Sequence, residues 1–239
     1  MEDKIIVTSI DDNEHYAEGL KVFLYSAYKN SGKEKIIVYL INQSDAYSES
    51  LFRLNPNIII NRLSMPGSSI FEKINVRYKI LFGLLNNYDK VAWIDNDAVV
   101  LKDLGGIWDG VGSNDIKILY RKNYHKKEHK KNRPECFFQG GIYVIGNGDP
   151  IKGWIKGIVD GSDGKQEWYT SQALMYLLYM KDKRINHLQL DNTYNDSKFR
   201  KNSHIWHCKQ SGFDNEIYQE KYKQILKELR EVESETRRT

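Results

Sequence analysis

Two aspartates separated by a single residue, Asp95 and Asp97, interrupt an otherwise apolar segment of the sequence. The residues before Asp95, 91–94 (VAWI), are all apolar, which is typical of a buried strand. Two anionic side chains at the end of a buried strand are unfavourable unless a cation neutralises them. We therefore interpret the pair as ligands of a divalent metal ion at the carboxyl end of a core strand, where open α/β sheets bind their ligands.

The spacing of the two aspartates is by itself a weak signal. In a chain with 17 aspartates, about one Asp-x-Asp sequence is expected by chance. A surface turn with two solvated carboxylates is therefore the alternative interpretation. The apolar segments on both sides of the pair, residues 91–94 and 98–101, favour the metal site, because a surface turn does not require them.

The residues that precede the pair predict strands that alternate with helices. Apolar runs predict strands, and apolar residues spaced three and four apart predict helices. The strands are expected at residues 4–10, 36–41 and 58–60, and the helices at 16–28 and 75–88. This alternation predicts βαβ units, and hence an α/β fold with a mainly parallel central sheet and flanking helices.

The remaining sequence predicts further elements of the same domain. A strand is expected at residues 137–145 (FFQGGIYVI), a helix at 167–180 and a short strand at 205–207 (IWH). Residues 214–239 form a charged segment with apolar residues four and three positions apart, which predicts a helix. We expect its apolar face to pack on its own domain, because there are too few heptads for a coiled coil.

Composition narrows the functional class only slightly. With 40% hydrophobic and 28% charged residues, the chain is typical of a globular protein, and its net charge of +4 is too small to predict nucleic-acid binding. Neither a membrane span nor a signal peptide is predicted. The two cysteines have no metal-binding spacing, so a cytoplasmic location is expected.

Residues 121–133 (RKNYHKKEHKKNR) form a strongly basic segment, with seven lysines and arginines against one glutamate. We interpret it as a solvated loop. The alternative is a segment that closes over a bound phosphate or attracts an anionic substrate.

The segment 89–104 (DKVAWIDNDAVVLKDL) resembles the metal-binding segment of GT-A glycosyltransferases. The likeness is greatest to family 8, the group of glycogenin and the lipopolysaccharide galactosyltransferases, with some likeness to family 34. It extends sparsely over residues 4–212. The resemblance implies a single GT-A domain over residues 1–213, with a donor-binding part (1–104) and an acceptor part (105–213), followed by the charged helix 214–239.

The resemblance also implies an activity. Such enzymes move a hexose or pentose from a nucleoside diphosphate sugar, here most simply a UDP-sugar, to a hydroxyl of a glycan or glycoprotein. They use Mn²⁺ or Mg²⁺, and the family's third metal ligand corresponds to His207, beside Asp95 and Asp97. Two carboxylates and an imidazole suit these ions better than a structural zinc. No nucleic-acid partner is implied, and we expect a monomer or weak dimer in the cytoplasm of a bacterium or of a virus-infected host cell.

Several residues of the first part match donor-binding positions of the family. The segment 7–19 (VTSIDDNEHYAEG) resembles the family's nucleotide-binding segment, which implies contacts of the base and ribose with Thr8, Ser9 and Ile10. Tyr16 is expected either to stack on uracil or to pack on the sheet. Further donor contacts are implied for Asn96, for Arg77 or Lys79, and for Lys209 at the phosphate.

The acceptor part departs from the family at one important position. The family has Asp-Gln on the helix that faces the anomeric carbon, whereas this chain has Ser171 and Gln172. We expect Asp191 or Glu167 to supply the missing carboxylate. The segment 138–141 (FQGG) resembles the family's F-N-x-G-like turn, which implies that Gln139 contacts donor or acceptor hydroxyls, and Gln172 is expected to be catalytic as well. Whether the reaction retains or inverts the anomeric configuration stays open.

The sequence leaves two alternative functions. A phosphotransferase of the haloacid-dehalogenase type also ends a strand in Asp-x-Asp, but it places this motif near the N-terminus. A non-catalytic sugar-binding domain of the same fold is the second alternative, and Ser171 is the residue that favours it.

Overall fold

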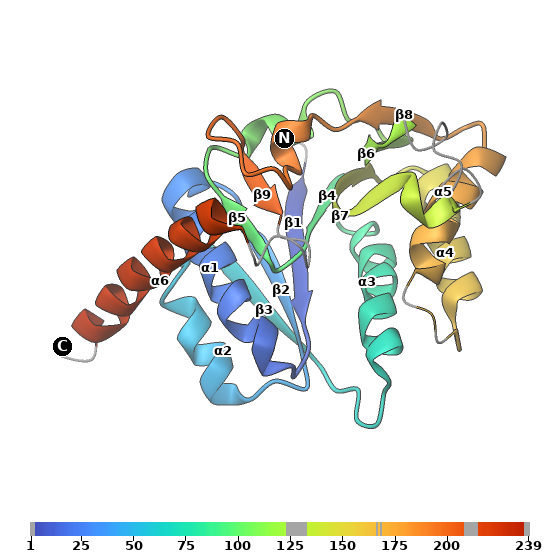
Figure 1. Ribbon diagram of the computed structural model, residues 1–239. Coiled ribbons are helices and arrows are strands. Elements are labelled where there is room, and N and C mark those ends of the chain that lie inside the picture. Colours follow the sequence, from blue (N-terminus) through green and yellow to red (C-terminus); the bar gives the residue numbers. More distant parts are fainter. Residues whose placement is uncertain (1–2, 123–132, 166, 168, 208–214, 237–239) are drawn as a thin grey trace. The chain divides into compact units, whose positions relative to one another are not determined.

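The computed structural model describes residues 3–122, 133–165, 167, 169–207 and 215–236 (Figure 1). Within these ranges, seven strands form one sheet in the order β3-β2-β1-β4-β7-β6-β8, and β5 and β9 form a separate two-stranded sheet. The predicted single α/β domain with a mostly parallel sheet and flanking helices is confirmed. The chain divides into two compact units. The first comprises residues 1–6, 65–93 and 107–191, and the second residues 7–64, 94–106 and 192–239.

The second unit contains the strand–helix alternation predicted near the N-terminus. Helix α1 buries the residues that form its predicted apolar face, which are Leu20, Phe23, Leu24 and Ala27. Strands β2 and β3 pair in parallel, as βαβ units require. The elements of this part are β1 (Lys4–Ile10, which begins in the first unit), α1 (Glu14–Ser31), β2 (Ile36–Ile41), α2 (Asp45–Phe52) and β3 (Ile58–Leu63).

The first unit contains residues 90–93 of β4, the strand that leads into the aspartate pair, and all five residues of this strand are buried. Strand β6 pairs antiparallel with β7 and parallel with β8. Nearby, the helix predicted at residues 75–88 begins earlier, because Ser69 and Glu72 form a capping box at its start. The elements of this unit are α3 (Ile70–Leu84), β4 (Lys90–Ile94), β6 (Asp115–Tyr120), β7 (Phe138–Gly146), α4 (Asp149–Ser162), α5 (Thr170–Lys181) and β8 (Asn186–Gln189).

The C-terminal helix α6 (Glu216–Thr236) packs on its own unit, as the apolar stripe predicted. Its residues Tyr218 and Ile225 join one buried cluster with Val99 of β5 (Ala98–Val100) and Trp206 of β9 (Ile205–His207). Figure 1 shows α6 running beside α1, and an ion pair joins these helices between Lys29 and Glu228. The helix therefore belongs to the same core as the two short strands.

Some predictions concern segments that the structure describes only in part. Of the basic segment 121–133, residues 123–132 lie outside the described residues. Among the residues that are described, no helix combines the length and the apolar character needed to cross a bilayer.

Candidate metal centre

The three predicted metal ligands lie together in the second unit. Asp95, Asp97 and His207 each offer one ligand atom, and these atoms lie within 4.8 Å of one another. The Nε2 atom of His207 is 3.4 Å from Asp95 Oδ2 and 3.3 Å from Asp97 Oδ1. Residues from distant parts of the sequence thus form one compact set of two oxygens and one nitrogen.

The two-stranded sheet explains how His207 reaches the aspartates. Strand β4 ends at Ile94 and β5 begins at Ala98, so both aspartates lie in the short connection between them. The amide of Ala98 donates to the carbonyl of Asp95 at 3.2 Å, which closes this connection into a turn. In the antiparallel pair of β5 with β9, Ala98 lies opposite His207. The pairing therefore brings the imidazole next to the turn.

Neighbouring residues hold the backbone of this turn in place. The side-chain amide of Asn96 donates to the carbonyl of Ser9 at 2.9 Å, and the hydroxyl of Tyr218 donates to the carbonyl of Asp97 at 3.3 Å. Gly19 lies close against the turn, since a Cβ atom there would be 3.4 Å from the carbonyl oxygen of Asn96. The turn is thus held by both β1 and α6.

The electrostatics of the cluster are those of an anionic site. His207 is only 5% exposed, and its Nδ1 atom lies 3.0 Å from Asn195 Oδ1. Burial lowers the pKa of His207, but the charge of Asp97, together with the charge and hydrogen bonds of both aspartates, raises the pKa to about 9. Asp97 Oδ1 lies 3.3 Å from Nε2 of the imidazole, so the two groups form an ion pair when His207 is protonated.

This arrangement fits a hard divalent cation. Once His207 is neutral, the two carboxylates carry an uncompensated charge in a partly buried site, which a divalent ion would neutralise. Octahedral ligands about 2.1 Å from Mg²⁺ are roughly 3.0 Å apart when they are adjacent, which is close to the observed separations. Two carboxylates with one imidazole suit Mn²⁺ or Mg²⁺.

Solved structures of two other proteins share the overall fold of this chain. A structure of WbbM, a bifunctional glycosyltransferase, matches with a TM-score of 0.62 and 20% identity, over 85% of this chain and 41% of that one. An active-site mutant of LgtC matches with a TM-score of 0.64 and 17% identity, over 93% of this chain and 95% of that one. Both proteins are glycosyltransferases. The chain has the GT-A fold.

At these identities the likeness establishes the fold alone. No protein-family model and no curated protein sequence matches the chain. The chain spans less than half the length of the WbbM structure, but almost the whole of the LgtC structure.

The residues predicted to contact the nucleotide lie in the second unit, with the metal ligands. Thr8 and Ile10 of β1 are buried, and Ser9 between them is partly exposed. Tyr16, near the start of α1, is 37% exposed, so its ring is not enclosed by the core. Lys209 lies outside the described residues.

The two basic residues predicted to reach the diphosphate lie on α3, in the first unit. The guanidinium of Arg77 lies over the ring of Tyr78, 4.9 Å from its centre. The ammonium of Lys79 is 3.5 Å from Asp163 Oδ1, and both side chains are largely exposed. An exposed ion pair of this kind contributes little to stability, so Lys79 is not fixed by it.

The two predicted catalytic glutamines also lie in the first unit, where both make hydrogen bonds within the protein. Gln139 Oε1 accepts from Arg121, at 3.1 Å from Nε and 2.5 Å from Nη2. The Gln172 amide donates to the carbonyl of Phe138 at 2.7 Å. Gln172 therefore ties α5 to the start of β7.

Position 171, where the family has an aspartate, is fully buried here. Within the described residues, the hydroxyl of Ser171 has no hydrogen-bond partner. Asp191 and Glu167, the two carboxylates expected to compensate, are exposed. The assignment of Asp191 to catalysis therefore stays a prediction.

Two residues near the cluster were missed as functional residues by the sequence interpretation. Asn195 contacts His207, and Tyr218 contacts the backbone of Asp97. Nothing in the local sequence around Asn195 indicates that its side chain meets His207. Tyr218 was recognisable only as part of an apolar stripe.

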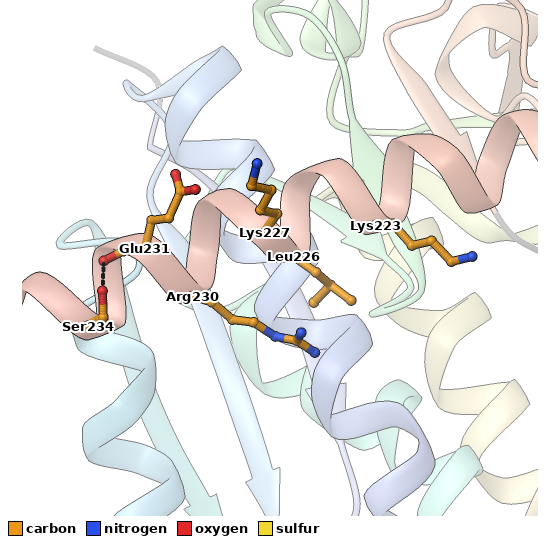
Figure 2. Close-up of a pocket in the computed structure, with 6 residues that line it drawn as sticks. All are labelled: Lys223, Leu226, Lys227, Arg230, Glu231 and Ser234. Carbon is orange, nitrogen blue, oxygen red and sulfur yellow. Dashed lines mark hydrogen bonds between the residues drawn. The ribbon is translucent and has the colours of Figure 1, made fainter.

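A hollow of about 350 Å³ runs along α6 and is a different feature from the cluster (Figure 2). Its lining combines basic, acidic and apolar side chains, and Ser234 donates to the carbonyl of Glu231 at 2.8 Å. With this mixed lining it indicates no particular ligand. The lining residues are Lys223, Leu226, Lys227, Arg230, Glu231 and Ser234.

Proposed function

We propose that the protein is a metal-dependent glycosyltransferase. It transfers a hexose or pentose from a nucleoside diphosphate sugar, most simply a UDP-sugar, to a hydroxyl of a glycan or glycoprotein. The observation that carries the proposal is the cluster of Asp95, Asp97 and His207 at the end of a core strand of a GT-A fold. The glycosyltransferases that share this fold support the same class of reaction.

The reaction breaks the bond between the anomeric carbon and the diphosphate oxygen, and forms a bond to the acceptor hydroxyl oxygen. The acceptor proton leaves to a base, and the diphosphate departs with increased negative charge. A bound Mn²⁺ or Mg²⁺ would stabilise this charge as a Lewis acid, by several kcal/mol. Asp95, Asp97 and His207 are the residues that would hold the ion.

The other donor contacts are proposals of the same kind. Thr8, Ser9 and Ile10 would line the base and ribose, and Tyr16 would stack on the base, which its exposure supports. Asn96 acts through the backbone of β1, since its side-chain amide holds Ser9. The diphosphate would be contacted by Arg77 or Lys79, and by Lys209.

The catalytic assignments concern Gln139, Gln172 and Asp191. The glutamines would position sugar or acceptor hydroxyls. Arg121 donates to the side chain of Gln139, and the side chain of Gln172 donates to the carbonyl of Phe138. Asp191 is an exposed carboxylate, and it would accept the proton of the acceptor hydroxyl if the reaction inverts. A cytoplasmic location and a monomer or weak dimer remain part of the proposal.

One alternative keeps a specific observation in its favour. A non-catalytic sugar-binding domain of the same fold is supported by the buried Ser171, which cannot supply the carboxylate found there in the family. The haloacid-dehalogenase alternative lacks such support, because it belongs to another fold.

A donor panel tests the proposal. The full chain is incubated with a set of nucleoside diphosphate sugars plus Mn²⁺, and release of the nucleoside diphosphate is measured. We expect slow hydrolysis of one donor, and its loss when EDTA replaces the metal. Donor binding without turnover would favour the sugar-binding alternative, and hydrolysis that persists in EDTA would reject metal dependence.

A further inference from the structure

We propose that Asn195 is a positioning residue of the metal centre, which orients His207 so that its Nε2 atom faces the metal. The inference rests on the proposed metal-dependent function and adds a residue with a defined task to it. Asn195 touches neither the metal nor the substrate. It acts through the histidine ring.

The contact between the two side chains has the geometry of a strong constraint. Asn195 Oδ1 lies 3.0 Å from His207 Nδ1, and the two residues are only 3% and 5% exposed. On the other side of the ring, Nε2 lies 3.3 Å and 3.4 Å from the two carboxylates. A buried ring with an oxygen on one nitrogen and two carboxylates on the other has little freedom to turn.

This contact selects the tautomer that a metal requires. An amide oxygen only accepts hydrogen bonds, so it requires a proton on Nδ1. In a neutral imidazole, a proton on Nδ1 leaves the lone pair on Nε2. That lone pair points at the site of Asp95 and Asp97, where the ion would bind. Partners of this type commonly orient the histidine ligands of metals.

The chain also fixes the position of Asn195 itself. The residue after it, Asp196, donates its amide to the carbonyl of Ile205 at 3.2 Å and accepts at its own carbonyl from the amide of His207 at 3.1 Å. Residues 195–196 therefore lie alongside β9. The register of this bridge, Asp196 with Trp206, sets Asn195 beside the imidazole.

The carboxylate of Asp196 anchors the loop that follows. It is almost fully buried and accepts from the amide of Lys198 at 2.8 Å, the amide of Arg200 at 2.8 Å and the hydroxyl of Ser203 at 2.6 Å. Three hydrogen bonds to one buried carboxylate hold residues 196–203 in one conformation. Asn195 thus projects from a fixed loop onto the histidine.

The choice of asparagine has a chemical consequence. An aspartate at this position would orient the ring equally well, but it would add a third negative charge to the cluster. A neutral amide sets the direction of the ring without this charge. The variant Asn195→Asp therefore keeps the orienting contact, whereas Asn195→Ala removes it.

Direct measurement of Mn²⁺ binding to the full chain tests the inference without an activity assay. By titration calorimetry at pH 8, we expect Asn195→Ala to weaken Mn²⁺ binding by about 10- to 100-fold, the usual effect of losing a partner of a ligand side chain. The Kd of Asn195→Asp for Mn²⁺ should lie within a few-fold of the Kd of the unchanged protein.

Asn55→Ala is the matched control. Asn55 is also a buried asparagine of the second unit, and it donates to the carbonyl of Leu24 and accepts from the amide of Asn57. It makes no contact with the cluster among the described interactions. Its substitution should lower the thermal midpoint as Asn195→Ala does, but leave Mn²⁺ affinity unchanged.

The outcomes separate the inference from the proposed function. The metal site itself is rejected if the unchanged protein fails to bind Mn²⁺. It is also rejected if Asp97→Ala binds Mn²⁺ with the same affinity as the unchanged protein. If Asp97→Ala loses binding while Asn195→Ala keeps it, only the role of Asn195 is rejected.

A measurement on the unchanged protein covers the case in which Asn195→Ala does not fold. In the Mg²⁺-loaded protein, ¹⁵N-detected NMR of the histidine rings should show His207 with its proton on Nδ1. A proton on Nε2 instead would overturn the inference.

Discussion

Ala98 and His207 lie opposite each other in the antiparallel pair of β5 and β9. Because Ala98 directly follows Asp97, this register brings the imidazole Nε2 to 3.3 Å from the second carboxylate. A slip of one residue in the pairing would turn the side chain of His207 to the opposite face. The candidate metal centre thus depends on the register of two strands of three residues each.

The first prediction concerns Asp97. Asp97→Ala removes one of the two carboxylates, so glycosyl transfer or donor hydrolysis should fall by at least about 10²-fold, as for loss of one main stabiliser of a developing charge. The variant also loses the ion pair of Asp97 with His207, so its stability should fall while the fold is kept. Activity is measured with Mn²⁺, and folding by circular dichroism.

Asp160→Ala is the control for this variant. Asp160 is an exposed aspartate of α4 that pairs with Lys156 one turn away. Its loss should leave the activity unchanged. Near-normal turnover of Asp97→Ala would contradict the proposed metal centre.

The second prediction is that metal affinity depends on pH. Burial lowers the pKa of His207, but the two aspartates raise it to about 9 in the metal-free protein. Since a metal binds only the neutral imidazole, binding must release a proton below this pH. The apparent Kd for Mn²⁺ should therefore fall by about tenfold per pH unit between pH 6.5 and 8.5. A Kd that does not change over this range would show that His207 is not a ligand.

The third prediction concerns the stability of the metal-free protein. The folded pKa of His207 lies above the usual value of 6.5, so its ion pairs stabilise the fold fully below about pH 6.5. This stabilisation is lost as the pH rises through about 9. The raised pKa corresponds to about 3 kcal/mol at 1.36 kcal/mol per pH unit, as an order of magnitude.

Urea unfolding in EDTA at pH 6, 8 and 10 measures this loss. His207→Gln cannot ionise, so this variant should show a smaller fall in the free energy of unfolding over the same range. Equal pH dependence in the two proteins would contradict the ion pairing of His207 with the aspartates.

Much of this fold was predictable because burial leaves a periodic pattern in the sequence. The apolar run before Asp95 predicted β4, and the spacing of Leu20, Phe23, Leu24 and Ala27 predicted the buried face of α1. The predicted start of α3, residue 75, is too late, because apolar periodicity does not mark the first turn of this helix. The pattern Ser69-x-x-Glu72 marks the actual start, and it is a signal that the sequence contains.

Other features leave no such pattern. Strand β8 has no buried residue, so its sequence does not alternate in a way that predicts a strand. The contact of Asn195 with His207 depends on the bridge between Asp196 and Trp206, and no local rule predicts a pairing of that kind. Local sequence therefore predicts elements and ligand types, whereas tertiary pairing decides which side chains support them.

The last prediction concerns the link between α6 and the metal-binding turn. Tyr218 is 1% exposed, and its hydroxyl donates to the carbonyl of Asp97 at 3.3 Å. Its ring packs on Phe199, with 5.1 Å between the ring centres. Tyr218→Phe keeps the ring and removes the hydroxyl bond. The free energy of unfolding should fall by about 0.5–1.5 kcal/mol, the usual contribution of one hydrogen bond.

The same variant should also weaken Mn²⁺ binding, because the carbonyl that Tyr218 holds belongs to a metal ligand. The effect should be smaller than the roughly tenfold loss expected for a direct partner of a ligand side chain, since Asn96 still holds the turn from β1.

Tyr222→Phe is the matched control. The hydroxyl of Tyr222 donates to an exposed carboxylate, Glu18, at 3.4 Å, so its loss should change neither stability nor affinity measurably. If both variants bind Mn²⁺ like the unchanged protein, α6 stabilises the unit without positioning the turn.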